Sequence, residues 1–94
     1  MRSPSFQDVL DARPRVYAAL QPSPLLHHPL LADWTGCDTW VKHENHLPTA
    51  AFKVRGGLNL VAQLTADERR RGVVSASTGN HGQSIAFACA REGV

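Results

Sequence analysis

The sequence has little that would tie it to an oxidising compartment, a membrane or a nucleic acid. Its 94 residues include only two cysteines, Cys37 and Cys89, which belong to no CxxC pair. We interpret them as reduced thiols and expect a cytoplasmic protein. No apolar run is long enough to span a bilayer, and residues 1–9 contain no apolar core of signal-peptide type. The formal net charge is only +2, which indicates neither a nucleic-acid nor a membrane-surface partner.

What is present is the composition of a folded protein. Hydrophobic residues make up 43% of the chain and charged residues 19%, with both signs interspersed, as in average globular proteins. A chain of this length holds at most one domain. We therefore expect no more than one domain within residues 1–94.

Turn formers divide the first half into short segments. Residues 5–20 have apolar spacing that suits one or two amphipathic helical turns, interrupted near Pro14. Residues 30–36 predict a short helix that ends at a glycine, and residues 39–42 predict a strand. Residues 45–49 are expected to be a loop.

The second half predicts an α/β pattern. Apolar residues at helical spacing predict a helix over 51–64, although Gly56 and Gly57 suggest that something packs closely there. A Ser/Thr-x-x-Glu capping box begins a short helix at Thr65. Residues 73–76 predict a strand and residues 81–92 a helix. This alternation is typical of parallel strands flanked by helices.

The chain ends where the glycine after a helix should lead into the next strand. A unit of two parallel strands leaves unpaired edges and uncovered apolar surface. We therefore expect these residues to be the front of a longer protein, or a truncated product.

Lys53 is the first candidate for chemistry. It follows a loop and lies in the first turn of the predicted helix, where the positive end of the helix dipole disfavours a second positive charge. Burial beside Phe52 would favour the free amine that attacks aldehydes. Taken alone, the stretch fits an exposed lysine that covers an apolar helix equally well.

The second candidate is the turn of residues 75–83, which leaves a predicted strand and opens a helix. Its glycines let backbone approach a ligand, and N–H groups at a helix start suit a carboxylate or phosphate. An ordinary helix cap is the alternative, but a cap needs only one of the polar side chains packed together here, which are Ser77, Thr78, Asn80 and His81.

Together these stretches resemble the fold-type-II pyridoxal-phosphate enzymes, in the branch of threonine/serine dehydratases (threonine ammonia-lyases) and serine racemases. The matching pieces are residues 24–25, 41–45, 49–56 and 77–83, in the family's order and spacing. The resemblance covers nearly all of residues 22–94. It implies the N-terminal part of a catalytic α/β domain, a parallel sheet flanked by helices.

The resemblance also implies a role for each matched residue. Lys53 would be the Schiff-base lysine for pyridoxal 5'-phosphate and would remove the Cα proton. Phe52 would pack beside the cofactor ring, and Asn80 would bind the cofactor's 3'-oxygen. The substrate carboxylate would be held by the turn residues Ser77, Thr78, Gly79, Asn80 and His81.

Three departures from the family pattern stand out. Ala50 occupies a position where the family usually has glycine, so we expect local backbone strain there. Racemases carry a serine at the position of Thr78, so racemisation is possible and not favoured. The family's glycine-rich phosphate loop has no counterpart within these 94 residues, and we expect the chain alone to bind the cofactor weakly and to be inactive.

The implied reaction is β-elimination from L-threonine or L-serine, giving a 2-oxo acid and ammonia. A small-molecule amino acid is the expected partner, with a homo-oligomer as the expected assembly of a full-length member. The alternatives are β-replacement or racemisation on the same cofactor, or a non-catalytic fragment. His43 and His46, three residues apart with no further Cys/His set, predict no metal site.

Overall fold

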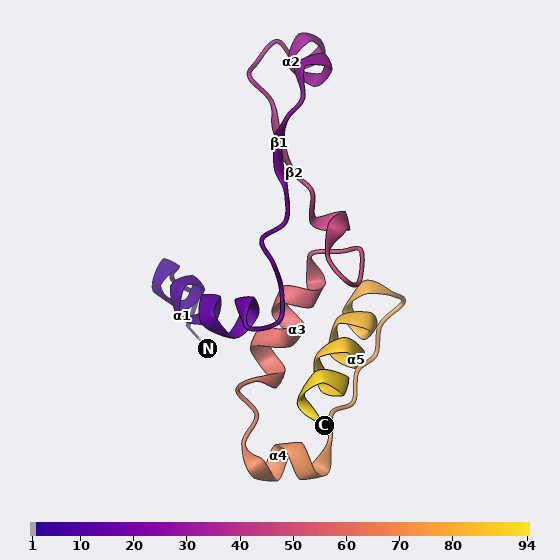
Figure 1. Cartoon of the computed structure of the whole chain (residues 1–94). Helices are drawn as coiled ribbons and strands as arrows, with labels where there is room; N and C mark the ends of the chain where they lie inside the picture. Colours follow the sequence, from indigo (N-terminus) through magenta and orange to yellow (C-terminus); the bar gives the residue numbers. More distant parts are fainter. Residues whose placement is uncertain (1) are drawn as a thin grey trace.

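The computed structural model describes residues 2–94 and contains a helical body with a projecting arm (Figure 1). The elements follow one another as α1 (Phe6–Tyr17), β1 (Leu25–His27), α2 (Pro29–Thr35), β2 (Trp40–Lys42), the 3₁₀ turn η1 (Glu44–His46), α3 (Lys53–Val61), α4 (Ala66–Arg71) and α5 (Asn80–Glu92). The described residues extend 53 × 28 × 24 Å.

The arm, residues 25–42, is an antiparallel hairpin with a helix at its tip. β1 pairs with β2 so that Leu26 lies opposite Val41, and α2 connects the two strands. Proline at the first position starts α2, and Gly36 ends it in the left-handed conformation, at φ 73°. The arm leaves large apolar side chains exposed, including Trp34 at 83%.

The core lies between α3 and α5, which pack side by side and begin at the same end of the pair (Figure 1). The two valines of α3, Val54 and Val61, are fully buried, as is Ala88 of α5. Burial of each valine contributes roughly 1.5–3 kcal/mol relative to exposure. Val16 and Leu20, in and after α1, join the same cluster.

Helix caps account for two of the helix starts. The Ser5 hydroxyl accepts from the Asp8 N–H at the start of α1, and the Thr65 hydroxyl accepts from the Glu68 N–H at the start of α4. In both helices the carboxylate of the acid also accepts a hydrogen bond from the backbone N–H of the cap residue, which completes a capping box. The box predicted at Thr65 is therefore confirmed.

The predicted break at Pro14 is wrong. α1 runs continuously through Pro14 to Tyr17. Pro14 has no backbone N–H, so α1 lacks one intrahelical hydrogen bond there, but its other bonds continue the helix. The capping box at Ser5 also supports the helix from its other end.

The strand predicted at residues 73–76 does not form within the described residues, where the only sheet is the antiparallel β1–β2 pair. Val74 is fully exposed. A strand is defined by ladder bonds to a neighbour, and nothing in residues 2–94 pairs with this segment. The parallel pairing expected from the alternation is thus absent from this part of the chain.

Candidate functional site

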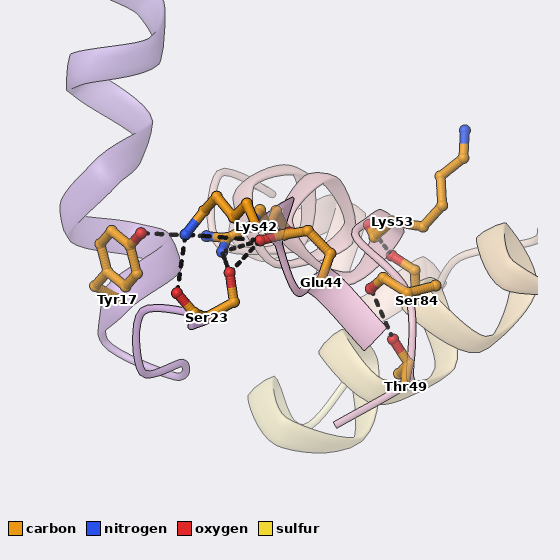
Figure 2. Close-up of polar contacts among 9 residues, drawn as sticks. Tyr17, Ser23, Lys42, Glu44, Thr49, Lys53 and Ser84 are labelled. Atoms are coloured by element: carbon orange, nitrogen blue, oxygen red, sulfur yellow. Dashed lines mark hydrogen bonds and ion pairs between the residues drawn. The ribbon is translucent and has the colours of Figure 1, made fainter. Parts of the chain in front are cut away.

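Lys53 is the first residue of α3, as predicted. Its side chain is exposed and points away from the rest of the chain (Figure 2). The Nζ atom lies 5.5 Å from the centroid of the Phe52 ring. Within residues 2–94 it makes no hydrogen bond or ion pair. The amine is therefore available to a ligand.

The expected burial of Lys53 beside Phe52 is wrong for the described chain. Phe52 is 60% exposed, and Lys53 is exposed as well. The apolar side of α3 that faces the core begins one residue later, at Val54. The start of α3 is thus exposed and lies outside the core.

Ala50 shows the strain expected from the sequence. Its φ is 53°, and it is the one non-glycine residue with positive φ among residues 2–94. For an alanine this left-handed conformation is unfavourable because of its Cβ. The bend it makes lies three residues before Lys53 and directs the chain from η1 into α3.

The turn of residues 77–81 lies at the start of α5. The hydroxyls of Ser77 and Thr78 are exposed, as are the side chains of Asn80 and His81. The Ser77 hydroxyl accepts from the Gly79 N–H at 3.1 Å. No side chain caps α5, so its first N–H groups remain available to an anion.

A buried serine joins the starts of the two helices. Ser84, in the second turn of α5, donates to the main-chain oxygen of Lys53 at 2.7 Å (Figure 2). The structure therefore brings Lys53 and the 77–81 turn to the same end of the α3–α5 pair. Within the described chain no hydrogen bond links the Lys53 amine to the turn itself.

A charged cluster lies on the other side of Lys53. The Arg55 guanidinium binds Glu44 with two nitrogens, Nε to Oε2 at 2.6 Å and Nη2 to Oε1 at 2.9 Å. Ser23 donates to the same carboxylate, and Tyr17 lies under Arg55 with the guanidinium carbon 5.6 Å from its ring centroid (Figure 2). The cluster ties α3 to η1 and to the end of α1.

The contacts in this cluster shift the pKa values of both Glu44 and Arg55. The hydrogen bonds from Arg55 lower the pKa of Glu44 to about 2 from an ordinary 4.5, against the opposing effect of partial burial. The same bonds raise the pKa of Arg55. Both groups therefore stay charged at neutral pH.

Sequence reasoning assigned no role to Glu44, Arg55 or Ser84. Glu44 and Arg55 lie 11 residues apart, and neither helix nor strand spacing predicts such a pair across a loop. Ser84 did leave a signal, because Gly57 predicts a close neighbour. A Cβ at Gly57 would lie 2.2 Å from the Ser84 Oγ.

Three of the five histidines, His28, His43 and His46, lie next to one another. The Nε2 atoms of His28 and His43 are 2.8 Å apart, and the His43 and His46 rings are 5.5 Å apart. Residues 2–94 contain no group of three or more His, Cys, Asp or Glu that could hold a metal ion.

No helix in the described part of the chain is long and apolar enough to cross a membrane.

Comparisons with known proteins bear on the site as a whole. The family model of pyridoxal-phosphate dependent enzymes matches residues 16–94. An L-threonine dehydratase of Corynebacterium glutamicum is 39% identical over 87 residues, covering 93% of this chain and 20% of that protein. The L-threonine ammonia-lyase of Thermotoga maritima is 37% identical, covering 89% of this chain and 21% of the other. A serine racemase of Dictyostelium discoideum is 32% identical, covering 94% and 27%.

A solved structure agrees with the sequence matches. The processed form of threonine deaminase isoform 2 from Solanum lycopersicum superposes with a TM-score of 0.81 at 36% identity, over 92% of this chain and 24% of that one. This chain spans about a fifth to a quarter of the length of these relatives. It belongs to the pyridoxal-phosphate dependent enzymes of fold type II, in the threonine/serine dehydratase and serine racemase branch, whose cofactor is pyridoxal 5'-phosphate.

Proposed function

We propose that this chain supplies the cofactor lysine and the substrate-carboxylate turn of an enzyme that eliminates water from L-threonine or L-serine. One observation carries the proposal. The amine of Lys53 has no partner within residues 2–94 and lies at the start of α3. Ser84 of α5 donates a hydrogen bond to the Lys53 main-chain oxygen, which holds this helix start beside the uncapped start of α5. The names of the relatives support the same reaction class.

The donor set fits the cofactor. A free lysine amine suits a covalent bond to its aldehyde carbon, and Lys53 Nζ is exposed and unpaired within residues 2–94. The exposed amide of Asn80 would donate to the 3'-oxygen, and the exposed Phe52 ring would pack beside the cofactor ring. When bound, pyridoxal phosphate supplies an electron sink for the charge that develops at the substrate Cα.

The 77–81 turn would hold the substrate. Its exposed hydroxyls, Ser77 and Thr78, and the free N–H groups at the start of α5 are donors, as a carboxylate requires. Gly79, Asn80 and His81 complete this turn. With the carboxylate held there, Lys53 Nζ would be freed when the substrate amine replaces it on the cofactor, and would then take the Cα proton. The β-hydroxyl would leave as water, and hydrolysis by a second water would give the 2-oxo acid and ammonia.

The whole protein's substrate is thus an amino acid with a β-hydroxyl, and we expect a homo-oligomer. The test is to incubate the whole protein with pyridoxal phosphate and L-threonine or L-serine, and to measure 2-oxo acid and ammonia. Equal amounts of both products, lost in Lys53→Ala and kept in Lys42→Ala, support the proposal. Products that persist in Lys53→Ala contradict the role of Lys53.

Racemisation is the second candidate on the same site. It is retained because the Thr78 hydroxyl is exposed and because the chain is similar to a protein named serine racemase. Assay of D-serine from L-serine separates racemisation from elimination, and thioether formation with an added thiol separates β-replacement. If none of these products forms and no lysine adduct is found, a non-catalytic fragment is the better reading.

A further inference from the structure

We propose that Ser84 is a positioning residue, which holds Lys53 in register with the 77–81 turn through its bond to the Lys53 backbone. The inference rests on the function proposed above. Ser84 would touch neither substrate nor cofactor, so its effect is on where Lys53 lies.

The bond is the strongest observation. The Ser84 residue is fully buried, with 0% of its surface exposed, and its Oγ donates to the Lys53 oxygen at 2.7 Å. A buried hydroxyl without a partner is costly, so this bond is strongly maintained. It joins two residues that are 31 positions apart in the sequence.

The bond also lies at the helix starts that carry the two groups proposed to bind ligand, the Lys53 amine and the 77–81 turn. Ser84 follows Asn80 by four residues and therefore shares its face of α5. Because Lys53 is the first residue of α3, the bond connects the first turn of one helix to the first two turns of the other. A shift of α5 relative to α3 at this level would change the distance from Lys53 to the turn directly.

Gly57 allows the close approach. It is buried and lies one turn after Lys53. A Cβ there would meet the Ser84 Oγ at 2.2 Å and the Ser84 main-chain oxygen at 2.7 Å. The Gly57–Ser84 contact thus sets the spacing of the two helices at the site end, while the valine at the other end, Val61, is packed without contact to Lys53.

No contact of the Lys53 side chain could hold this residue in place if the bond from Ser84 were lost. Its amine makes no hydrogen bond or ion pair within residues 2–94. Lys42, the other lysine of the sequence, is by contrast held by the Ser23 main-chain oxygen at 3.1 Å. The placement of the Lys53 amine therefore depends on its backbone, and Ser84 holds that backbone.

The test compares the two lysines within one chain. The purified protein is incubated with substoichiometric pyridoxal phosphate, reduced with borohydride, and the adducts at Lys53 and Lys42 are quantified by peptide mass spectrometry. We expect the adduct at Lys53 to dominate in the unmodified chain. Asn80→Ala should remove this preference, because it deletes a proposed cofactor contact.

Ser84→Ala deletes the hydroxyl and keeps the Cβ. We expect it to lower the Lys53-to-Lys42 ratio by about tenfold, since displacements of an ångström can cost one to two orders of magnitude in reactivity. Val61→Ala is the matched control. It loses buried α3 volume at the far end of the helix and should leave the ratio unchanged at a temperature where both variants are folded.

The outcomes separate the two proposals. No preference for Lys53 in the unmodified chain contradicts the proposed function. A preference that Asn80→Ala removes and Ser84→Ala keeps overturns the role of Ser84 alone, as does an equal loss of preference in Val61→Ala.

If Ser84→Ala does not fold, the unmodified chain still tests the inference. Proton NMR should then show a Ser84 hydroxyl protected from exchange with water, and rapid exchange would contradict the bond. Gly57→Ala, which forces α5 away from α3 but keeps the hydroxyl, should also lower the ratio. An unchanged ratio there would count against positioning by this contact.

Discussion

At the scale of single residues, the Glu44–Arg55 pair connects the first turn of α3 to η1. Each side chain is about one quarter exposed or less, so solvent screens the pair only in part. Arg55 lies two residues after Lys53, and its bonds to Glu44 and Tyr17 link this turn to η1 and α1. Loss of the pair should therefore affect both stability and the site.

Glu44→Gln should lower the free energy of unfolding at pH 7 by on the order of 2 kcal/mol, between the values for exposed and buried pairs. Denaturant titration of both proteins measures this loss. Asp67→Asn, which removes an exposed partner of Arg70, is the control and should change little. An equal effect of the two substitutions would contradict the account.

The same pair predicts a pH dependence. Folding lowers the pKa of Glu44 from 4.5 to about 2, so its stabilisation is complete above about pH 4.5 and is lost as the pH falls towards 2. Asp8 and Glu68 also have lowered pKa values. Only the difference between the unmodified chain and Glu44→Gln isolates Glu44, and this difference should shrink between pH 4.5 and 2. A constant difference would be inconsistent with the shift.

Ala50→Gly should stabilise the chain by about 0.5–1 kcal/mol, because relief of the left-handed strain exceeds the added freedom of glycine in the unfolded chain. Thermal unfolding measures the gain. Ala51→Gly, whose residue does not have positive φ, should instead destabilise the chain. A loss of stability in both variants would remove the argument for strain.

At this scale the sequence predicted Lys53 at a helix start, the unusual Ala50 and close packing at Gly57, whereas the close packing predicted at Gly56 is wrong, because a Cβ there would meet nothing within 4 Å. It did not predict the exposure of Phe52 or the bond from Ser84. Those depend on which helix faces approach in three dimensions, and side-chain periodicity within one helix does not specify its partner.

At the scale of elements, the residues that begin and end helices were the most predictable feature. Gly36 ends α2 and the Thr65 box begins α4 because these signals act within one turn. The prediction at Pro14 was wrong because the loss of one backbone N–H did not end a helix whose other bonds form. Residues 73–76 failed as a strand because pairing needs a neighbour that residues 2–94 do not provide.

Thr65→Ala should lower the free energy of unfolding by about 1 kcal/mol through loss of the α4 cap. Urea titration gives the change, and hydrogen exchange should show faster exchange of the α4 amides than of the α5 amides. Ser75→Ala, at an exposed residue outside any cap, serves as the comparison. No difference between the two variants would contradict the capping role.

At the scale of the whole molecule, the arm makes the chain extended. The radius of gyration is 16.2 Å, whereas a compact domain of this length has about 12 Å. Apolar side chains remain exposed along it, among them Leu30 and Trp34 of α2 and Trp40 of β2. Contacts within these residues therefore concentrate in the α3–α5 pair.

This shape predicts weak cooperativity for the 94-residue chain on its own. Unfolding in urea should be shallow, with a slope below about 1 kcal/mol/M, the lower end for small compact proteins, because little surface is exposed on unfolding. Circular dichroism against urea concentration measures the slope. A steep, cooperative transition would show that the chain buries more surface than the structure has.

The identity of the cofactor lysine is the claim on which the functional account depends, and one spectroscopic titration tests it directly. Pyridoxal phosphate is added to the whole protein and to its Lys53→Ala and Lys42→Ala variants, and the visible absorbance of the lysine-bound cofactor is followed. The account predicts saturable absorbance in the unmodified protein and in Lys42→Ala, and none in Lys53→Ala. Absorbance that survives in Lys53→Ala would contradict it.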